Sequence, residues 1–452
     1  MKMEKTSPSR NSDQRQAAIE LSELRDLATD VRERVLRRSR ASFGVLRAEV
    51  EQIIEDVRRR GDAALCEYLA RFDHVNLCPE QLRVTSGEIE LASERLQGHT
   101  LGLLRRQIGI SRTFHEAQRR PESWVVETAP GVEVGQLMRP LDSAGLYVPG
   151  GRATYPTVMQ ILAVPAAVAG VPRIVACTPP HSESNGEIGP PDVVLAAAAL
   201  AGVHEVYRIG GPAAVAALAY GTETVAKVDK ILGPGNVYVQ AAKLLVFGEV
   251  GIDQIAGPSE VLILADETAN PVHVAADLLA QAEHDPKAAV VLVTWSRSLA
   301  EATQREVERQ LALAPRREVI AEALASFGLI VVTQNELEAI AFTNDYAPEH
   351  LEVLTSTPRE LLPKLKHAGS IFLGDYAPVA VGDYASGSNH VLPTGQAARF
   401  FSPVSVESYL KASQFQMLTK QGLEGLSEII TTLAELEGLP AHAASVRVRF
   451  EG

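Results

Sequence analysis

Apolar residues near the beginning of the chain recur at helical spacing between charged ones. A spacing of three to four residues places side chains on one face of a helix, so this pattern predicts one or two amphipathic helices between Gln14 and about Arg40. Residues 1–12 are polar, and we expect them to be disordered. A second apolar set at the same spacing predicts a further helix that ends at Gly61. The two sets are Ile19, Leu21, Leu24 and Leu27, and then Val50, Ile53, Ile54 and Val57.

The middle of the chain has a different pattern, in which short apolar runs alternate with helical stretches. Near-continuous hydrophobicity is typical of strands buried on both faces, and the stretches 192–201 and 212–219 supply helical crossovers. The pattern predicts an α/β fold with largely parallel sheets. From about Ser405 the chain is expected to be mostly helical. The predicted strands are 173–177, 205–209, 230–232, 261–265, 289–293, 329–332 and 370–373.

Composition and charge narrow the classes of partner. The chain has 452 residues, and its formal net charge of −13 disfavours nucleic acid unless a strong basic patch exists. The basic runs Arg37-Arg38-Ser39-Arg40 and Arg58-Arg59-Arg60 are too short for that, and we interpret them as solvated helix faces. The longest apolar run, 193–203, is about half a membrane span and indicates a buried helix.

The cysteines and the N-terminus bear on the compartment. Three cysteines, Cys66, Cys78 and Cys177, show neither disulfide density nor close metal-type pairing, so a reducing cytoplasm is expected. The polar start of the chain does not have the pattern of a secretory signal.

Glycine-rich turns are the first candidates for ligand binding. The chain contains neither G-x-G-x-x-G nor a Walker A motif, but it has Pro149-Gly150-Gly151, Gly210-Gly211-Pro212 and Gly233-Pro234-Gly235-Asn236 near predicted strand ends. Two of these turns lead into helices, whose first N–H groups can receive phosphate. Each could equally be a tight strand-to-helix turn, and Asn236 could simply cap the helix that follows.

Two further segments carry side chains suited to metal binding or proton transfer. Gln281 and His284 are three residues apart after an apolar helical run, so they can share one face and hold one ion. The alternative is a helix end capped before Pro286. Glu349 and His350 are adjacent, and both types of side chain transfer protons near neutral pH. On an extended chain they would point to different sides, whereas a plain surface pair is the alternative interpretation.

Histidines elsewhere differ in their settings. The polar, glycine-flanked loop from Gly382 to His390 has the character of a functional loop. His442, near the C-terminus, is unremarkable by itself. The remaining histidines lack such settings, and we expect them to be structural or on the surface: His74, His99, His115, His181, His204, His273 and His367.

Together these segments resemble the histidinol dehydrogenase family, from about Arg60 to the C-terminus and in the same order. Many ordered motifs over most of the chain make chance similarity negligible. The motifs are Arg60-Gly61-Asp62-Ala63-Ala64-Leu65, Arg71-Phe72-Asp73, Gly145 to Gly151, Val228 to Ile231 with Gly233 to Asn236, Ala256 to Val261, Gln281 to His284, Pro348-Glu349-His350, Gly382 to His390, Val391 to Thr394, and Glu437 with His442.

The resemblance implies an enzyme that oxidises L-histidinol to L-histidine through the aldehyde, with two NAD⁺, in the last steps of histidine synthesis. It implies one Zn²⁺ per subunit, held by Gln281, His284, Asp383 and His442. A nitrogen-rich set with one carboxylate suits zinc. The family's metal also takes the imidazole and amine of the substrate, so its main role would be orientation.

The resemblance also implies the remaining roles. His350 would take the alcohol proton, and Glu349 would activate the water that attacks the aldehyde. Substrate contacts would come from Ser259, His390 and Glu437, and cofactor contacts from Tyr147 and Asn236. Family members are homodimers, and Glu437 and His442 would lie in a tail that reaches into the site of the partner.

The expected architecture follows from pattern and resemblance together. We expect two incomplete Rossmann-like α/β domains, with a disordered start and helical arm over 1–44 and a helical dimerisation tail over 405–452. The first domain would comprise 45–146 and 261–404, and the second 147–260.

Two positions depart from the family pattern. Ala213 stands where a glutamine associated with NAD is common, and Val158 follows Thr157 where two small hydroxyl residues are usual. Three other functions stay open beside the first: a paralogue that oxidises another small polar alcohol, a zinc hydrolase, and a non-catalytic dimeric binding protein.

Overall fold

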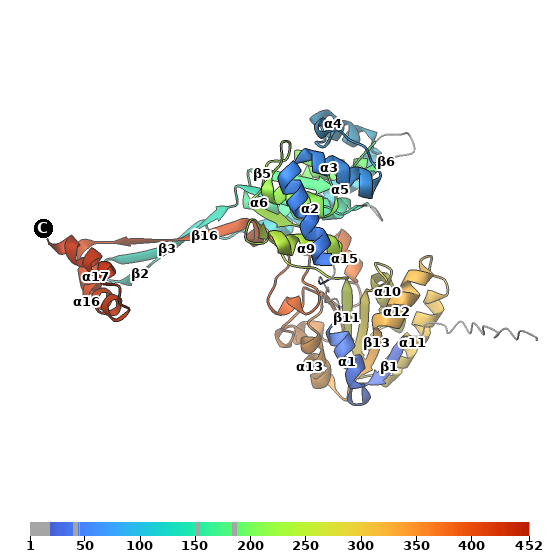
Figure 1. Cartoon of the computed structure of the whole chain (residues 1–452). Helices are drawn as coiled ribbons and strands as arrows, with labels where there is room; N and C mark the ends of the chain where they lie inside the picture. The colour runs from blue at the N-terminus through green and yellow to red at the C-terminus, as the bar shows by residue number, and fades with distance from the viewer. Residues whose placement is uncertain (1–18, 39–43, 45, 151–153, 183–187, 452) are drawn as a thin grey trace, which may run out of the picture.

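The computed structural model describes residues 19–38, 44, 46–150, 154–182 and 188–451. The expected disordered start, 1–12, lies outside these residues. Two α/β lobes lie next to each other, and a long β arm that ends in two helices projects from one of them (Figure 1). Among the described residues, no helix combines the length and the apolar character needed to cross a membrane.

The first lobe is built on a six-stranded, wholly parallel sheet with strand order β1-β13-β12-β11-β14-β15. Its central strands are buried along their whole length, as the continuous apolar runs predict. Side chains of successive strand residues point to opposite faces of this sheet. On one face they pack against α10, α11 and α12, and on the other face they pack against α1 and α13. The strands are β1 (Glu20–Glu23), β11 (Glu260–Ala265), β12 (Ala289–Thr294), β13 (Gly328–Val332), β14 (His350–Leu354) and β15 (Ser370–Leu373).

The helices of this lobe connect the strands as crossovers. The N-terminal α1 and the short α14 and α15 complete the layers. Their bounds are α1 (Thr29–Leu36), α10 (Pro271–Ala282), α11 (Arg297–Leu311), α12 (Arg317–Phe327), α13 (Glu336–Tyr346), α14 (Pro358–Leu361) and α15 (Val379–Tyr384).

The second lobe has a five-stranded parallel sheet with order β10-β9-β4-β5-β8. One core joins this sheet to α4 to α7, and the other joins it to α2, α3, α8 and α9. The strands are β4 (Ser143–Tyr147), β5 (Arg173–Thr178), β8 (Glu205–Arg208), β9 (Lys230–Leu232) and β10 (Gly251–Ile252), with a small hairpin of β6 (His181–Ser182) and β7 (Ile188–Gly189). The helices are α2 (Leu46–Arg60), α3 (Asp62–Tyr68), α4 (Ser86–Arg95), α5 (Gly98–Glu116), α6 (Pro156–Ala169), α7 (Asp192–Ala201), α8 (Gly211–Tyr220) and α9 (Val237–Val246).

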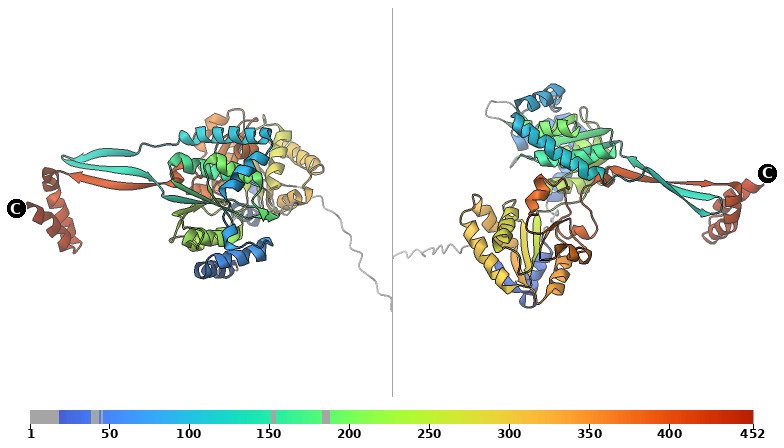
Figure 2. Two further views of the ribbon diagram at one scale, coloured as in Figure 1. Left: turned by 90° about the horizontal axis from the view of Figure 1, so that it is seen from above. Right: turned by 180° about the vertical axis from the view of Figure 1, so that it is seen from behind.

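The arm is a three-stranded antiparallel sheet of β2 (Ser123–Ala129), β3 (Val132–Pro140) and β16 (Leu410–Leu418), with β3 in the middle. Two helices, α16 (Lys420–Leu436) and α17 (Pro440–Arg447), pack together at its tip. Both views in Figure 2 place this tip far from the lobes. The tip exposes several large apolar side chains, among them Ile429, Leu433 and Leu436.

Several expectations are wrong in detail. The segment 45–146 does not belong with 261–404, because β4 is a central strand of the second sheet and α2 to α5 pack on that lobe. Residues 20–23 form strand β1 instead of a helix, since the open edge of β13 offers backbone partners there. The C-terminal stretch is mostly helical, as expected, but it also contains strand β16, which pairs with β3 along nine residues before the helices begin.

Candidate active site

The adjacent Glu349 and His350 lie at the amino ends of the strands in the first lobe. His350 is the first residue of β14, and Glu260 is the first residue of the neighbouring β11. Glu349 and His350 are each only 5% exposed, so the pair is not a surface pair. A buried acid beside a buried base is a common feature of functional sites.

Both side chains of this pair bind to the same residue of β11. The Glu260 N–H donates to Glu349 Oε2 (2.8 Å), and the Glu349 N–H donates to Glu260 Oε1 (3.1 Å). His350 Nδ1 lies 3.0 Å from the Glu260 carbonyl oxygen and 3.5 Å from Glu349 Oε2. The expectation that the two side chains point to different sides is therefore wrong. Glu349 precedes the strand and follows Ala347, whose φ of 49° bends the chain.

The electrostatic setting of His350 favours its taking up a proton. Burial lowers the pKa of the imidazole, but the Glu349 and Asp383 carboxylates and the bond to the Glu260 carbonyl outweigh it and raise this pKa to about 9. Its outer nitrogen, Nε2, lies 3.9 Å from Asp383 Oδ1 and has no hydrogen-bond partner among the described residues. That nitrogen is thus the one available to a substrate.

Of the four expected metal ligands, Asp383 lies beside this pair, 3.9 Å from His350 Nε2, and two others come from the end of α10 and the residues after it. Gln281, in the last turn of α10, is 2% exposed, and the exposed His284 follows just beyond the helix. Asp383 is in α15, which packs against α10. The expected loop from Gly382 to His390 therefore begins inside this short helix.

His390 and Ser259 lie beside the same site. Burial lowers the pKa of His390 to about 4, against the opposing effect of Asp383, and the charges of His350 and His284 add to the lowering. Its Nε2 is buried and has no partner among the described residues. Ser259 directly precedes Glu260 and is half-buried.

The remaining two expected site residues are not brought to this place within one chain. Glu437 directly follows α16 and His442 is in α17, and both are exposed at the tip of the arm (Figures 1 and 2). No three His, Cys, Asp or Glu side chains of the described ranges form a group that could hold a metal ion. Within one chain, the described residues therefore do not bring together all the site residues that the resemblance implies.

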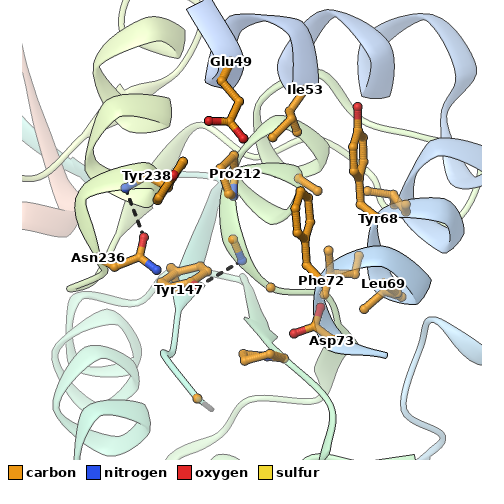
Figure 3. Close-up of a pocket in the computed structure, with 17 residues that line it drawn as sticks. Glu49, Ile53, Tyr68, Leu69, Phe72, Asp73, Tyr147, Pro212, Asn236 and Tyr238 are labelled. Atoms are coloured by element: carbon orange, nitrogen blue, oxygen red, sulfur yellow. Dashed lines mark hydrogen bonds between the residues drawn. The ribbon is translucent and has the colours of Figure 1, made fainter. Parts of the chain in front are cut away.

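A pocket of about 350 Å³ opens at the carboxyl ends of the strands in the second lobe (Figure 3). Tyr147 at the end of β4 and Asn236 after β9 both line it. Two of the glycine-rich turns also contribute, through Gly150 and through Gly210 and Gly211. A Cβ added at Gly210 would lie 2.8 Å from Cβ of Pro179, so this wall requires glycine.

Hydrogen bonds fix the two polar side chains of this pocket. Tyr147 Oη accepts from the Gly211 N–H (3.1 Å), and burial raises the pKa of the phenol to about 12. Asn236 Oδ1 accepts from the N–H groups of Tyr238 and Val239, so the expected helix cap is confirmed. Stacked rings of Tyr68 and Phe72 form the opposite wall, with centroids 5.8 Å apart.

Two further charged residues lie near Glu349 and His350. The basic run that contains Arg38 predicts a solvated helix face, but the Arg38 side chain is fully buried against Glu260. In the sequence, Glu260 stands out only as part of a family motif. A signal existed for Glu260, since a charged residue at the start of an otherwise apolar strand requires a partner. The Arg58-Arg59-Arg60 run does lie largely on a solvated helix face, as expected.

The buried acid–base pair beside Asp383, together with the pocket of the second lobe, favours an enzyme of the α/β class. The family model described as histidinol dehydrogenase matches residues 36–450. Histidinol dehydrogenase from Methanothermobacter thermautotrophicus is 50% identical over 416 residues, which cover 92% of this chain and 96% of that protein. The protein of that name from Gloeobacter violaceus is 48% identical over 431 residues, covering 95% of this chain and 96% of its own.

A solved structure agrees with these sequence matches. The crystal structure of histidinol dehydrogenase from Elizabethkingia anophelis superimposes with a TM-score of 0.89 at 37% identity, covering 96% of this chain and 98% of that one. The chain belongs to the histidinol dehydrogenase family, whose members are NAD-dependent oxidoreductases of histidine biosynthesis.

Proposed function

We propose that the chain oxidises L-histidinol to L-histidine through L-histidinal, a four-electron reaction that uses two NAD⁺. The observation that carries the proposal is the buried Glu349–His350 pair, held by Glu260 at the amino edge of the first sheet. The identity of the substrate is inferred from membership of the family.

The two side chains divide the proton transfers. In its neutral form, which grows as the pH rises toward the raised pKa of about 9, His350 presents the lone pair of Nε2 to the site and takes the proton of the alcohol in the first oxidation. Glu349 takes a proton from the water that attacks the aldehyde, which gives the hydrated aldehyde for the second oxidation. His350 is buried, so its proton affinity is set by fixed neighbours instead of by bulk water.

The donors around His350 fit zinc. Gln281, His284 and Asp383 supply an amide oxygen, an imidazole nitrogen and a carboxylate, and His442 of a second copy would add an imidazole. The unpartnered Nε2 of His350 beside Asp383 leaves room for a further polar group there. When bound, zinc orients the substrate and polarises the groups that it holds.

The arm supports a homodimer in which each subunit completes the site of the other. Glu437 and His442 lie at the tip, beyond the reach of their own lobes (Figure 1), and the apolar side chains there are suited to a covering partner. In such a dimer Glu437 would contact the substrate together with Ser259 and His390. The tail would thus serve dimerisation as well as catalysis.

The pocket of the second lobe is the proposed place for NAD. It combines an apolar wall with glycine turns at the starts of α8 and α9, and Tyr147 and Asn236 line it. This lobe is Rossmann-like but incomplete, since it lacks the G-x-G-x-x-G turn. When bound, NAD⁺ accepts one hydride in each oxidation. A cytoplasmic location fits the free cysteines and the requirement for NAD.

One assay tests this function. The purified, zinc-loaded protein is incubated with L-histidinol and NAD⁺, and NADH and histidine are both measured. Two NADH for each histidine are expected. NADH formation with another amino alcohol but not with histidinol would support a family paralogue, and product without NADH would support hydrolysis.

A further inference from the structure

Arg38 joins two chain segments that flank the catalytic pair. Its Nη2 donates to Glu260 Oε1 (2.8 Å) and to the Tyr346 carbonyl (2.9 Å), while Nε lies 2.8 Å from Glu260 Oε2. The guanidinium carbon also lies 3.1 Å from the centre of the Tyr346 ring. Both ion-pair side chains are 0% exposed. Arginine suits such a place, since its planar group can pair with a carboxylate and stack on a ring at once.

Each of these two segments leads directly to a catalytic side chain. Tyr346 ends α13, and only Ala347 and Pro348 separate it from Glu349. Glu260 begins β11 and binds Glu349 through both its N–H and its carboxylate. Glu260 Oε1 also accepts a hydrogen bond from the Gly395 N–H (3.2 Å), so the same carboxylate contacts the loop that contains Gly395.

The contact to His350 has a chemical consequence. A carbonyl oxygen can only accept a hydrogen bond, so the 3.0 Å contact between the Glu260 carbonyl and Nδ1 requires the proton to be on Nδ1. In the neutral imidazole, Nε2 then carries the lone pair. The position of Glu260 therefore decides which nitrogen of His350 can take a proton from the substrate.

We propose that Arg38 and Glu260 are positioning residues for the oxidation: their ion pair holds Glu349 in place, and the main-chain carbonyl of Glu260 keeps His350 in the tautomer whose Nε2 is the base. This inference rests on the proposed function of the catalytic pair. Arg38 comes from the N-terminal segment, which is anchored by the pairing of β1 with β13. That segment thus contributes to catalysis without touching the substrate.

A purely structural role makes a different prediction. Breaking a buried ion pair by removing one partner destabilises a protein, whereas replacing both partners with apolar side chains is often neutral or stabilising. If the pair only supports folding, the double replacement should restore both stability and activity. If it positions the catalytic residues, stability should return while turnover stays low.

The test compares Arg38→Met, Glu260→Gln and the double variant Arg38→Met/Glu260→Met, each as the full-length, zinc-loaded protein. Thermal stability, zinc content, kcat and KM are measured for both histidinol and histidinal. We expect the double variant to melt near the wild-type temperature and to keep its KM values and zinc. Its kcat should fall about 100-fold in both half-reactions, the usual cost of misplacing a catalytic group.

Arg173→Met is the matched control. Arg173 forms a two-bond pair with Glu205 at the far edge of the second sheet, so its loss should affect stability but not kcat. A double variant with the kcat of the wild type would overturn the proposal. If the methionine variants do not fold, Arg38→Lys decides, because lysine keeps the charge but loses the fork and the stacking. Reduced kcat at normal stability then supports positioning, and unchanged kcat refutes it.

Measuring the wild-type protein in parallel shows whether a negative result contradicts this inference or the proposed function. Failure of the wild type to form NADH from histidinol contradicts the function itself. Normal wild-type turnover with unaffected positioning variants contradicts only the role of Arg38 and Glu260.

Discussion

The two lobes use opposite edges of their parallel sheets. The pocket of the second lobe lies at the carboxyl ends of β4, β5, β8 and β9, the usual ligand edge of an α/β sheet. The catalytic pair of the first lobe lies at the amino ends of β11 and β14. A carboxyl edge offers turns and helix N-termini, whereas the amino edge here has buried charged side chains.

Each lobe nevertheless fixes its functional loop with a buried ion pair. In the first lobe this is Arg38 with Glu260. In the second, Lys243 pairs with Asp253, and its Nζ also donates to the carbonyls of Gly233 and Gln254 (3.0 Å each). Asp253 in turn accepts from the Gly233 N–H, at the start of the turn that carries Asn236. The difference lies in what each ion pair holds: the proposed proton-transfer pair in one lobe and the turn of the proposed NAD pocket in the other.

The largest effect is expected from a substitution in the arm, which lies outside both parallel sheets. His442→Ala should weaken zinc binding by more than about 100-fold, the upper cost seen when even an outer-shell partner of a metal ligand is lost. Zinc content after gel filtration measures this, with Glu424→Gln, at an exposed position of α16, as the control. Normal metal content would remove His442 from the ligand set.

The same residue allows the exchange of arms to be tested. In a heterodimer of His350→Ala and His442→Ala chains, one site has both defects and the other has none, so about half of the wild-type activity should return. Each homodimer should be inactive. Verified heterodimers without activity would place the whole site within one chain.

A smaller effect is expected at the ion pair of the second lobe. Lys243→Met leaves the Asp253 carboxylate buried without its partner, which should lower the free energy of unfolding by about 3–5 kcal/mol. Lys243→Met/Asp253→Asn should recover part of this loss. Urea titration of both variants measures it, and an unchanged midpoint in the single variant would refute the structural importance of the pair.

A modest effect is expected where the chain departs from its family. Ala213 is buried in the wall of the proposed NAD pocket, where the family commonly has glutamine. Ala213→Gln should lower the KM for NAD⁺ about fivefold, as one added hydrogen bond would, while the KM for histidinol stays the same. An increased KM for NAD⁺ would mean that the pocket is too tight for glutamine here.

The smallest effect is expected on the surface of the second lobe. Arg58 in α2 makes a 3.5 Å contact with Glu55, and both side chains are more than half exposed. Its guanidinium carbon also lies 5.1 Å from the centre of the Tyr220 ring. Arg58→Ala should lower the free energy of unfolding by less than about 1 kcal/mol. A loss as large as that of Lys243→Met would show that burial does not separate the two kinds of ion pair.

Hydrophobic patterning predicted the elements that are apolar throughout. The runs of β5, β11, β12 and β13 were assigned correctly, since both faces of those strands are buried. Strand β14 was missed because His350 and Glu352 interrupt its apolar pattern. Strand β1 was misassigned because three or four residues cannot distinguish a helix face from an edge strand.

The candidate site was predicted mainly through the resemblance. Spacing alone left Glu349, His350 and Asn236 open to plain structural interpretations, and the cap at Asn236 is indeed present. Arg38 could not be recognised, because its burial depends on contacts with Glu260 and Tyr346, more than 200 residues away in the chain. Long-range contacts of this kind leave no local pattern.

The most direct measurement is the ratio of the two half-reactions in Glu349→Gln. Only the oxidation of histidinal needs activated water, and losing a general base costs about 100- to 10,000-fold. Single-turnover oxidation of histidinal should therefore slow by about that factor, while oxidation of histidinol to the aldehyde slows far less. Equal losses in both half-reactions would contradict the division of labour between Glu349 and His350.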